Sequence, residues 1–312
     1  MNSVSPVKFS VCIPVYEGRE FLRETLASVR AQTWGGWELV VVEDGSREPV
    51  RDLVEAFSRE VSQKVTYVAH DKNWGVAYAR DTALEHASQE WIALLDADDF
   101  WSPDHLASLA ATIAREEQLE FIFSSYRRLD GSFGGLGRDV FPKPADLERI
   151  RSSVYFLRIK LKPSCFAFSM RLLERTGPWS RDVDRLPWFL SGGCNSSEDR
   201  NFILRCVQAD ARMGWSGELT VNYRKHPAAM TVTSSDGPVY RASYYHLHGS
   251  MRGISKRKQR QFIAKLQVEA ARNLKQDGRM DAAAWFFFRA WCWQPREFSR
   301  LVKAVRVLLW RR

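Results

Sequence analysis

The sequence predicts an α/β fold, with a mostly parallel sheet flanked by helices and a helical appendage at the C-terminus. Apolar, β-rich runs alternate with amphipathic helical segments four times in the first hundred residues, which is typical of a doubly wound, right-handed sheet. From about residue 246 the pattern changes to basic amphipathic helix. We therefore expect an α/β domain over residues 1–245 and a basic helical region over 246–312.

The strand–helix repeats are recognised by apolar spacing. The unbroken run from Leu39 to Val42 indicates a strand buried on both faces, as in a parallel sheet. Phe21, Leu22 and Leu26 recur on one helical face. The predicted strands cover 8–16, 37–46, 64–70 and 90–99, and the predicted helices cover 19–32, 50–61 and 75–88.

The following residues continue the pattern less regularly. Ser102 and Pro103 predict a helix start, with Ser102 as N-cap and Pro103 in the first helical position. Further strands are predicted at 119–129, 164–169 and 218–226, and helices at 147–160 and 196–208. The Gly- and Pro-rich stretch 131–145 predicts a mobile loop, either a lid or a plain connector. Asp277-Gly278 predicts the turn of a helical hairpin that ends at Pro295.

Charge and composition exclude several classes of protein. Residues 246–312 hold 16 Lys and Arg against 4 Asp and Glu, whereas the rest of the chain holds 30 against 33. Because the body lacks an excess of basic residues, nucleic acid is not an expected partner. The five cysteines are scattered without a CxxC pair, which favours a reducing, cytoplasmic setting. No apolar run reaches the 18 to 20 residues, roughly, that a membrane-spanning helix needs.

Polar residues gather where three of the predicted strands end, at 14–17, 43–46 and 96–99. Ligands bind at the carboxyl ends of strands in open α/β sheets, so these segments should converge. Asp-Gly-Ser at 44–46 is also a common turn, and Tyr16 alone also fits simple packing. Three acids in 96–99 repel one another and raise each other's pKa, which a bound divalent cation such as Mn²⁺ or Mg²⁺ would offset.

Three segments, 10–46, 73–101 and 196–206, resemble an inverting family 2 glycosyltransferase of the GT-A fold. Their order and spacing agree with that family over residues 8–226. The resemblance implies transfer of a sugar from a nucleotide-diphosphate donor, with a UDP-sugar favoured, to an acceptor hydroxyl. It also implies a divalent cation, Mn²⁺ or Mg²⁺, shared with the diphosphate.

The resemblance assigns residues to the donor. The implied donor-binding residues are Pro14, Tyr16, Glu17, Asp44, Arg80, Asp96 and Ala97. Tyr16 would lie near the base, Asp44 near the uracil or ribose, and Arg80 near the diphosphate. The implied metal-binding residues are Asp98, Asp96 and His226. His226 could equally be structural, and Asp99 could be a ligand or a turn-capping acid.

Glu198 and Asp199 match the catalytic Glu-Asp pair of the family, with Asp199 as general base. The alternative is that two acids in a first helical turn only complement the helix dipole. Trp188 and Phe189, just before this pair, could stack on an acceptor sugar or belong to the core.

Three positions depart from the family pattern. Glu17 and Asp81 stand where Asn is usual, and Glu43 replaces the first Asp of Asp-Asp-Gly-Ser. Glu17 and Asp81 add negative charge, so the details of the nucleoside pocket are left open by the resemblance.

The basic tail and the reaction class each have competing interpretations. The basic terminal helices, with Trp310, suit peripheral contact with anionic lipid on the inner face of the plasma membrane. Such a location would fit a lipid-linked or glycan acceptor in surface polysaccharide, lipopolysaccharide or other glycoconjugate synthesis. Alternatively, the tail is a docked hairpin with a solvated basic face. Two other functions are alternatives: a metal-dependent nucleotidyltransferase, which should show a Gly-rich phosphate loop, and a non-catalytic nucleotide-sugar-binding module.

Overall fold

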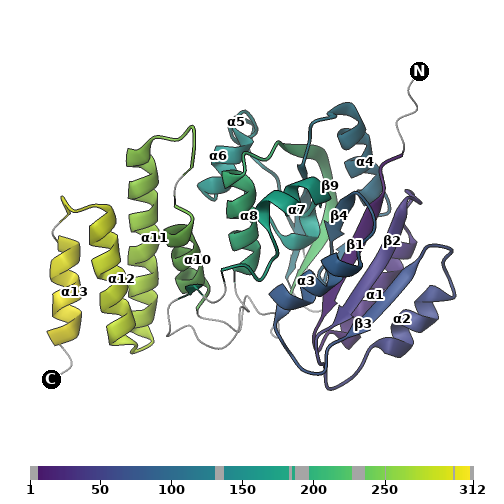
Figure 1. The fold of residues 1–312 in the computed structure, drawn as a ribbon, viewed down its shortest axis with the longest axis horizontal. Coiled ribbons are helices and arrows are strands. Elements are labelled where there is room, and N and C mark those ends of the chain that lie inside the picture. Colours follow the sequence, from purple (N-terminus) through teal and green to yellow (C-terminus); the bar gives the residue numbers. More distant parts are fainter. Residues whose placement is uncertain are drawn as a thin grey trace. The chain divides into compact units, whose positions relative to one another are not determined.

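A computed structural model of the chain describes residues 6–130, 137–182, 185–186, 197–226, 236–249, 251–297 and 299–309. The chain forms two compact units (Figure 1). The first comprises Met1–Ser180 and Ala211–Pro227, and the second comprises Arg181–Asp210 and Ala228–Arg312. These units differ from the 1–245 and 246–312 domains expected from the sequence, because Arg181–Asp210 groups with the C-terminal helices. The domain boundaries themselves stay a prediction.

The first unit is built on a mixed sheet whose strand order, in the described residues, is β3-β2-β1-β4-β8-β6-β9-β5, with β7 paired to β6. The strands are β1 Phe9–Val15, β2 Trp37–Glu43, β3 Val65–Ala69, β4 Trp91–Leu94, β5 Phe100–Trp101, β6 Phe121–Asp130, β7 Gly137–Val140, β8 Phe166–Ser169 and β9 Met213–Lys225. Strands β3, β2, β1 and β4 run parallel, which confirms the predicted doubly wound half. Strand β8 is antiparallel to both of its neighbours, β4 and β6.

Helices connect and flank these strands (Figure 1). Their bounds are α1 Arg19–Arg30, α2 Arg51–Ser58, α3 Val76–His86, α4 His105–Arg115, α5 Pro144–Leu147, α6 Ile150–Tyr155 and α7 Met170–Thr176, with a 3-10 turn at Pro163–Cys165. Every residue of β1, β2 and β4 is buried, as expected for strands covered on both faces. Phe21, Leu22 and Leu26 form the buried face of α1, as their spacing predicts.

Two predicted elements differ from the structure. Helix α4 begins at His105 rather than Pro103, and Ser102, just after β5, is tied to β9 instead: its N–H donates to the carbonyl of Thr220 at 2.8 Å. Within the predicted loop 131–145, Gly137–Val140 forms β7, since its backbone pairs with β6. Residues 131–136, part of the predicted lid or connector, lie outside the described residues.

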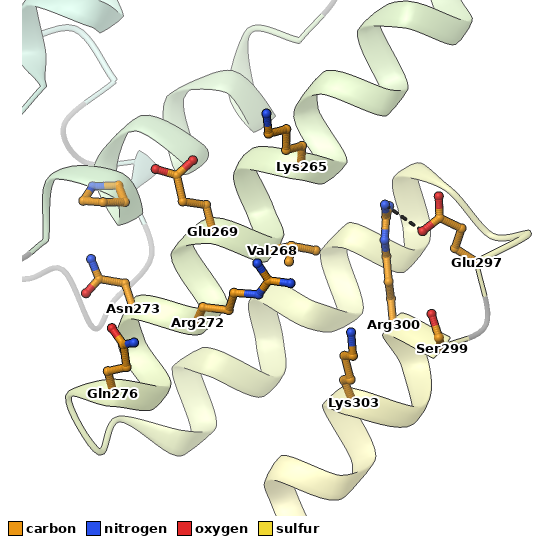
Figure 2. Close-up of a pocket in the computed structure, with 11 residues that line it drawn as sticks. Lys265, Val268, Glu269, Arg272, Asn273, Gln276, Glu297, Ser299, Arg300 and Lys303 are labelled. Carbon is orange, nitrogen blue, oxygen red and sulfur yellow. Dashed lines mark ion pairs between the residues drawn. The ribbon is translucent and has the colours of Figure 1, made fainter.

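The second unit is helical in its described part. It contains α8 Glu198–Gln208, α10 Gly237–Leu247, α11 Lys256–Gln276, α12 Met280–Trp293 and α13 Ser299–Leu309. Helices α11 and α12 form the predicted hairpin, and Gly278 turns the chain with a left-handed φ of +74°. Side chains of α11 and α13 line a cavity of about 550 Å³ (Figure 2). A bilayer-crossing helix, long and apolar throughout, does not occur in the described ranges.

Candidate active site

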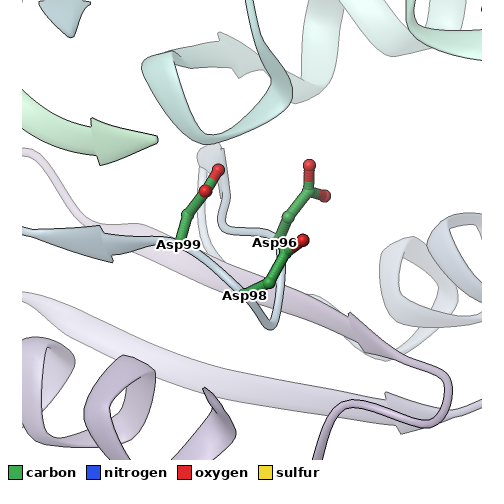
Figure 3. Close-up of side chains that lie close together, drawn as sticks. All are labelled: Asp96, Asp98 and Asp99. Atoms are coloured by element: carbon green, nitrogen blue, oxygen red, sulfur yellow. The ribbon is translucent and has the colours of Figure 1, made fainter. Parts of the chain in front are cut away.

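The three aspartates predicted to bind a metal come together after the end of β4 (Figure 3). One carboxylate oxygen from each of Asp96, Asp98 and Asp99 lies within 4.8 Å of the others. The side chains of Asp96 and Asp98 are 25% and 32% exposed, whereas Asp99 is fully buried. Two of the three acids are therefore open to a ligand.

Asp99 is held by the protein itself. Its Oδ2 accepts a hydrogen bond from the Ser164 hydroxyl at 2.5 Å, and its Oδ1 accepts one from the backbone N–H of Arg224 at 2.9 Å. Burial, with the nearby charges of Asp98 and Asp96, raises the pKa of Asp99 well above its usual range. Ser164 Oγ also accepts the N–H of Asp96 at 3.1 Å. Asp99 and Ser164 thus shape the turn that presents the other two acids.

Arg80 compensates part of the negative charge. Its buried guanidinium donates to Asp96 Oδ1 at 2.7 Å and lies over the Trp179 ring, 4.7 Å from the centroid. The position of Trp179 is fixed by Asp81, whose carboxylate accepts the backbone N–H groups of Trp179 at 2.5 Å and Ser180 at 2.9 Å. The acidic residue at position 81 therefore has a structural role: it anchors the segment that covers Arg80.

The end of β9 contributes two further residues. His226 Nε2 lies 3.0 Å from Asp98 Oδ2, so the predicted histidine is beside the predicted metal-binding acid. Arg224 donates from Nη1 to the carbonyl of Asp98 at 2.7 Å and forms an ion pair with Glu24. Its guanidinium also packs over Phe21, 4.8 Å from the ring centroid. Arg224 therefore ties the aspartate turn to α1.

Sequence reasoning missed Arg224 and Ser164. The position of Arg224 two residues before His226 is a usable signal, because alternate residues of a strand share a face. Ser164 has no comparable signal, since it meets Asp99 only through a contact 65 residues apart in the chain.

Replacing Arg224 with methionine removes the donor to the Asp98 carbonyl while keeping an unbranched apolar stem. We expect the free energy of unfolding to fall by about 1–3 kcal/mol, because a mostly buried acceptor loses its partner. Divalent-cation affinity should fall about tenfold, as for other residues that orient metal ligands. Chemical denaturation and Mn²⁺ titration measure these effects. Arg128→Met on the exposed part of β6 is the control, and unchanged Mn²⁺ affinity in Arg224→Met would contradict this positioning role.

The loop after β2 is organised by Asp44, the predicted contact for the uracil or ribose. Asp44 is 2% exposed, and its carboxylate accepts hydrogen bonds from the N–H groups of Trp74 at 2.9 Å and Gly75 at 2.8 Å, with His70 Nδ1 at 2.7 Å. A Cβ on Gly45 would lie 2.3 Å from the carbonyl carbon of residue 72, so only glycine fits this close approach. Asp44 thus joins the loops that follow β2 and β3.

Two exposed aromatic rings lie on loops at the carboxyl ends of these parallel strands. Tyr16 after β1 is 53% exposed and Trp74 after β3 is 49% exposed. Exposed rings of this size are suited to stacking on a flat base. Trp74, which sequence reasoning did not select, packs 5.3 Å from the His70 ring. Pro14, by contrast, is buried within β1 and pairs with Val42.

The acidic departures in this region also have local partners. Glu17 adopts a left-handed φ of 50°, its N–H donates to Ser46 Oγ at 3.1 Å, and its carboxylate accepts from Arg47 Nε at 2.9 Å. This pairing lowers the pKa of Glu17. Glu43 is buried and accepts the N–H of Val50 at 3.0 Å, which closes the turn into α2. The charge that Glu17 adds is therefore compensated by Arg47, whereas Glu43 has a structural hydrogen bond.

The predicted catalytic pair begins α8 in the second unit. Glu198 is buried, whereas Asp199 is partly exposed, and Asp199 Oδ1 accepts the N–H of Arg200 at 2.6 Å. Ser197 before them has a left-handed φ of 60°. Their roles in catalysis stay predictions. Trp188 and Phe189 lie outside the described residues.

A mixed α/β sheet that presents an Asp-x-Asp pair at the carboxyl end of a parallel strand is typical of glycosyltransferases of the GT-A fold. The family model for glycosyl transferase family 2 matches residues 10–176, more than half of the chain. The chain therefore belongs to glycosyl transferase family 2. Its fold is similar to that of S. aureus TarS in a crystal structure with UDP-GlcNAc, with a TM-score of 0.68 and 19% identity over 96% of this chain and 88% of TarS.

Two curated relatives extend the comparison. The succinoglycan biosynthesis protein ExoW of Rhizobium meliloti is 36% identical over 111 residues, which are 35% of this chain and 34% of ExoW. The protein WfgD of Escherichia coli, a UDP-Glc:alpha-D-GlcNAc-diphosphoundecaprenol beta-1,3-glucosyltransferase, is 27% identical over 166 residues, 51% of this chain and 64% of WfgD. The chain thus spans less than two thirds of each relative.

Proposed function

We propose that this protein is an inverting glycosyltransferase that moves a sugar from a UDP-sugar to an acceptor hydroxyl. The observation that carries the proposal is the pair of partly exposed acids, Asp96 and Asp98, set beside Arg80 at the carboxyl edge of the parallel strands. The UDP-GlcNAc bound by TarS and the UDP-Glc named for WfgD support a uridine donor. Family membership favours this reaction over nucleotidyl transfer.

The donor set at the aspartates fits a divalent cation. Asp96 and Asp98 offer carboxylate oxygens, the hard ligands that Mn²⁺ and Mg²⁺ prefer, and His226 stands beside Asp98. Asp99 is a poorer ligand, because both of its oxygens already accept hydrogen bonds. When bound there, the cation would neutralise the diphosphate and stabilise the UDP leaving group.

The protein's own side chains supply the remaining roles. Tyr16 and Trp74 would flank the base, while Asp44 keeps the Trp74 loop in place. Arg80 would bring a fixed positive charge near the diphosphate. Asp199 would take the proton from the acceptor hydroxyl as that oxygen attacks the anomeric carbon, and attack opposite the leaving group inverts the configuration.

The acceptor is proposed to be a glycan or a lipid-linked sugar in surface polysaccharide, lipopolysaccharide or related glycoconjugate synthesis. The names of ExoW and WfgD support this class. We predict a cytoplasmic location with peripheral contact to anionic lipid on the inner face of the plasma membrane, because the C-terminal helices are strongly basic. This location suits a lipid-linked acceptor.

A thermal-shift screen of nucleotide-sugars tests the donor and the cation together. UDP-sugars should raise the melting temperature in the presence of Mn²⁺, because a ligand at about one hundred times its dissociation constant adds about 2.7 kcal/mol to the free energy of unfolding. The same ligand with EDTA should have little effect, and GDP-sugars serve as the control for the base. Absence of any nucleotide-sugar effect, with or without Mn²⁺, would contradict the proposed donor class.

A further inference from the structure

The cavity of about 550 Å³ in the second unit is bounded by α11 and α13 (Figure 2). The residues that line it are Pro238, Lys265, Val268, Glu269, Arg272, Asn273, Gln276, Glu297, Ser299, Arg300 and Lys303. We propose that this α11–α13 groove binds the negatively charged groups of an anionic glycan chain. The choice of a glycan rests on the proposed function, but the groove is a binding site separate from the donor site.

Positive charge in the groove exceeds what its own acids neutralise. Glu269 pairs with Arg241 and Glu297 pairs with Arg300, each at 2.8 Å (Figure 2 shows the second pair). Three other cations, Lys265, Arg272 and Lys303, have no ion-pair partner in the described part of the chain. Like charges gathered along one groove repel one another, and an anionic ligand removes that cost.

The spacing of these cations suits a chain with repeated charges. Lys265 and Arg272 are seven residues apart on α11, so they lie on one face about 10 Å apart along the helix axis. Lys303 comes from α13. A guanidinium such as that of Arg272 can bind a carboxylate or a phosphate through two hydrogen bonds. A single small anion would meet only part of this set.

The shape and lining favour a soluble chain over a bilayer surface. Only Val268 and Pro238 are apolar, and the site is hollowed rather than raised. Helices that lie on a membrane present a continuous row of apolar side chains to the acyl chains, and the residues that line this groove do not form such a row. Asn273, Gln276 and Ser299 instead offer neutral hydrogen-bonding groups beside the cations, as the hydroxyls of a carbohydrate require.

Calorimetric titration of the full chain with an oligogalacturonate tests the assignment, with the methyl-esterified oligomer as the uncharged counterpart. The acidic oligomer should bind, more weakly as salt increases, and the esterified one should bind at least about tenfold more weakly. Arg272→Gln combined with Lys303→Gln should lower affinity for the acidic oligomer at least about tenfold. Lys256→Gln combined with Lys258→Gln, an equal charge change on exposed residues at the start of α11, should leave it unchanged.

Several outcomes would overturn the proposal that the α11–α13 groove binds an anionic glycan. These are equal loss of affinity in the two double variants, equal binding of the acidic and esterified oligomers, or no binding of the acidic oligomer by the unaltered protein. Vesicles of phosphatidylcholine with phosphatidylglycerol form the second arm. If the groove variant loses vesicle binding while oligogalacturonate binds to neither protein, the occupant is a lipid headgroup and the glycan assignment is wrong.

The readouts separate this site from the donor site. The Mn²⁺-dependent thermal shift with UDP-sugar should be the same in the groove variant and the unaltered protein, because none of the changed residues belongs to the donor site. Oligogalacturonate binding without any donor-induced shift would count against the proposed transferase alone. A normal donor-induced shift without oligogalacturonate binding would count against the groove alone.

Discussion

Asp199→Asn is expected to lower the rate of sugar transfer by about 10²–10⁴-fold, because the amide cannot accept the proton of the acceptor hydroxyl. Donor binding should be nearly unchanged, since the substitution keeps the size of the side chain and Asp199 is not assigned to the donor. The whole decrease in rate should therefore appear in the turnover number, measured with saturating donor and acceptor. The Mn²⁺-dependent donor affinity is measured beside it.

The matched control for this variant is Asp277→Asn, which removes one carboxylate from an exposed turn of the same unit. It should transfer sugar at the rate of the unaltered protein. Turnover in Asp199→Asn close to that of the unaltered protein would remove Asp199 as the base. The acids at the start of α8 would then only complement the helix dipole.

Asp98→Ala is expected to weaken Mn²⁺-dependent donor binding at least about a hundredfold, because it removes an open carboxylate ligand. Losing a metal ligand should lower affinity more than losing a residue that only orients a ligand. The metal-free protein should be no less stable, since removing one of three clustered carboxylates relieves repulsion of Asp99. The measurements are calorimetric UDP-sugar titration with and without Mn²⁺, and chemical denaturation in EDTA.

Asp104→Ala is the control, because Asp104 is exposed, lies six residues further along the chain and makes no side-chain capping hydrogen bond to α4. It should bind donor and Mn²⁺ normally. Donor binding that is equally tight in EDTA would exclude the metal assignment. Loss of stability in metal-free Asp98→Ala would instead indicate that Asp98 is a structural partner of His226.

Much of the architecture follows from local pattern. The unbroken apolar runs of β1, β2 and β4 predict a sheet buried on both faces, and alternation with amphipathic helices predicts its parallel half. The antiparallel insertion of β8 was not predictable in this way. Its pairing with β4 joins residues more than seventy positions apart, and no periodicity records such a partner.

The candidate site shows the same division between neighbouring residues and distant ones. The sequence alone identified Asp96, Asp98 and His226 as site residues, because they occur in short motifs at the ends of strands. The same motifs also indicated the family. Which aspartate is open and which is buried depends on Ser164 and on the N–H of Arg224, and only the fold brings these two to Asp99.

For the loops and the tail, composition determined the chemical character and the tertiary structure determined the arrangement. The Asp-Gly-Ser turn after β2 is visible in the sequence, but its use of Asp44 to hold the Trp74 loop arises from a contact 30 residues away. The basic C-terminal region is likewise evident from residue counts. Packing of α11, α12 and α13 decided that three cations face one groove, because ion pairing and burial depend on neighbours in space.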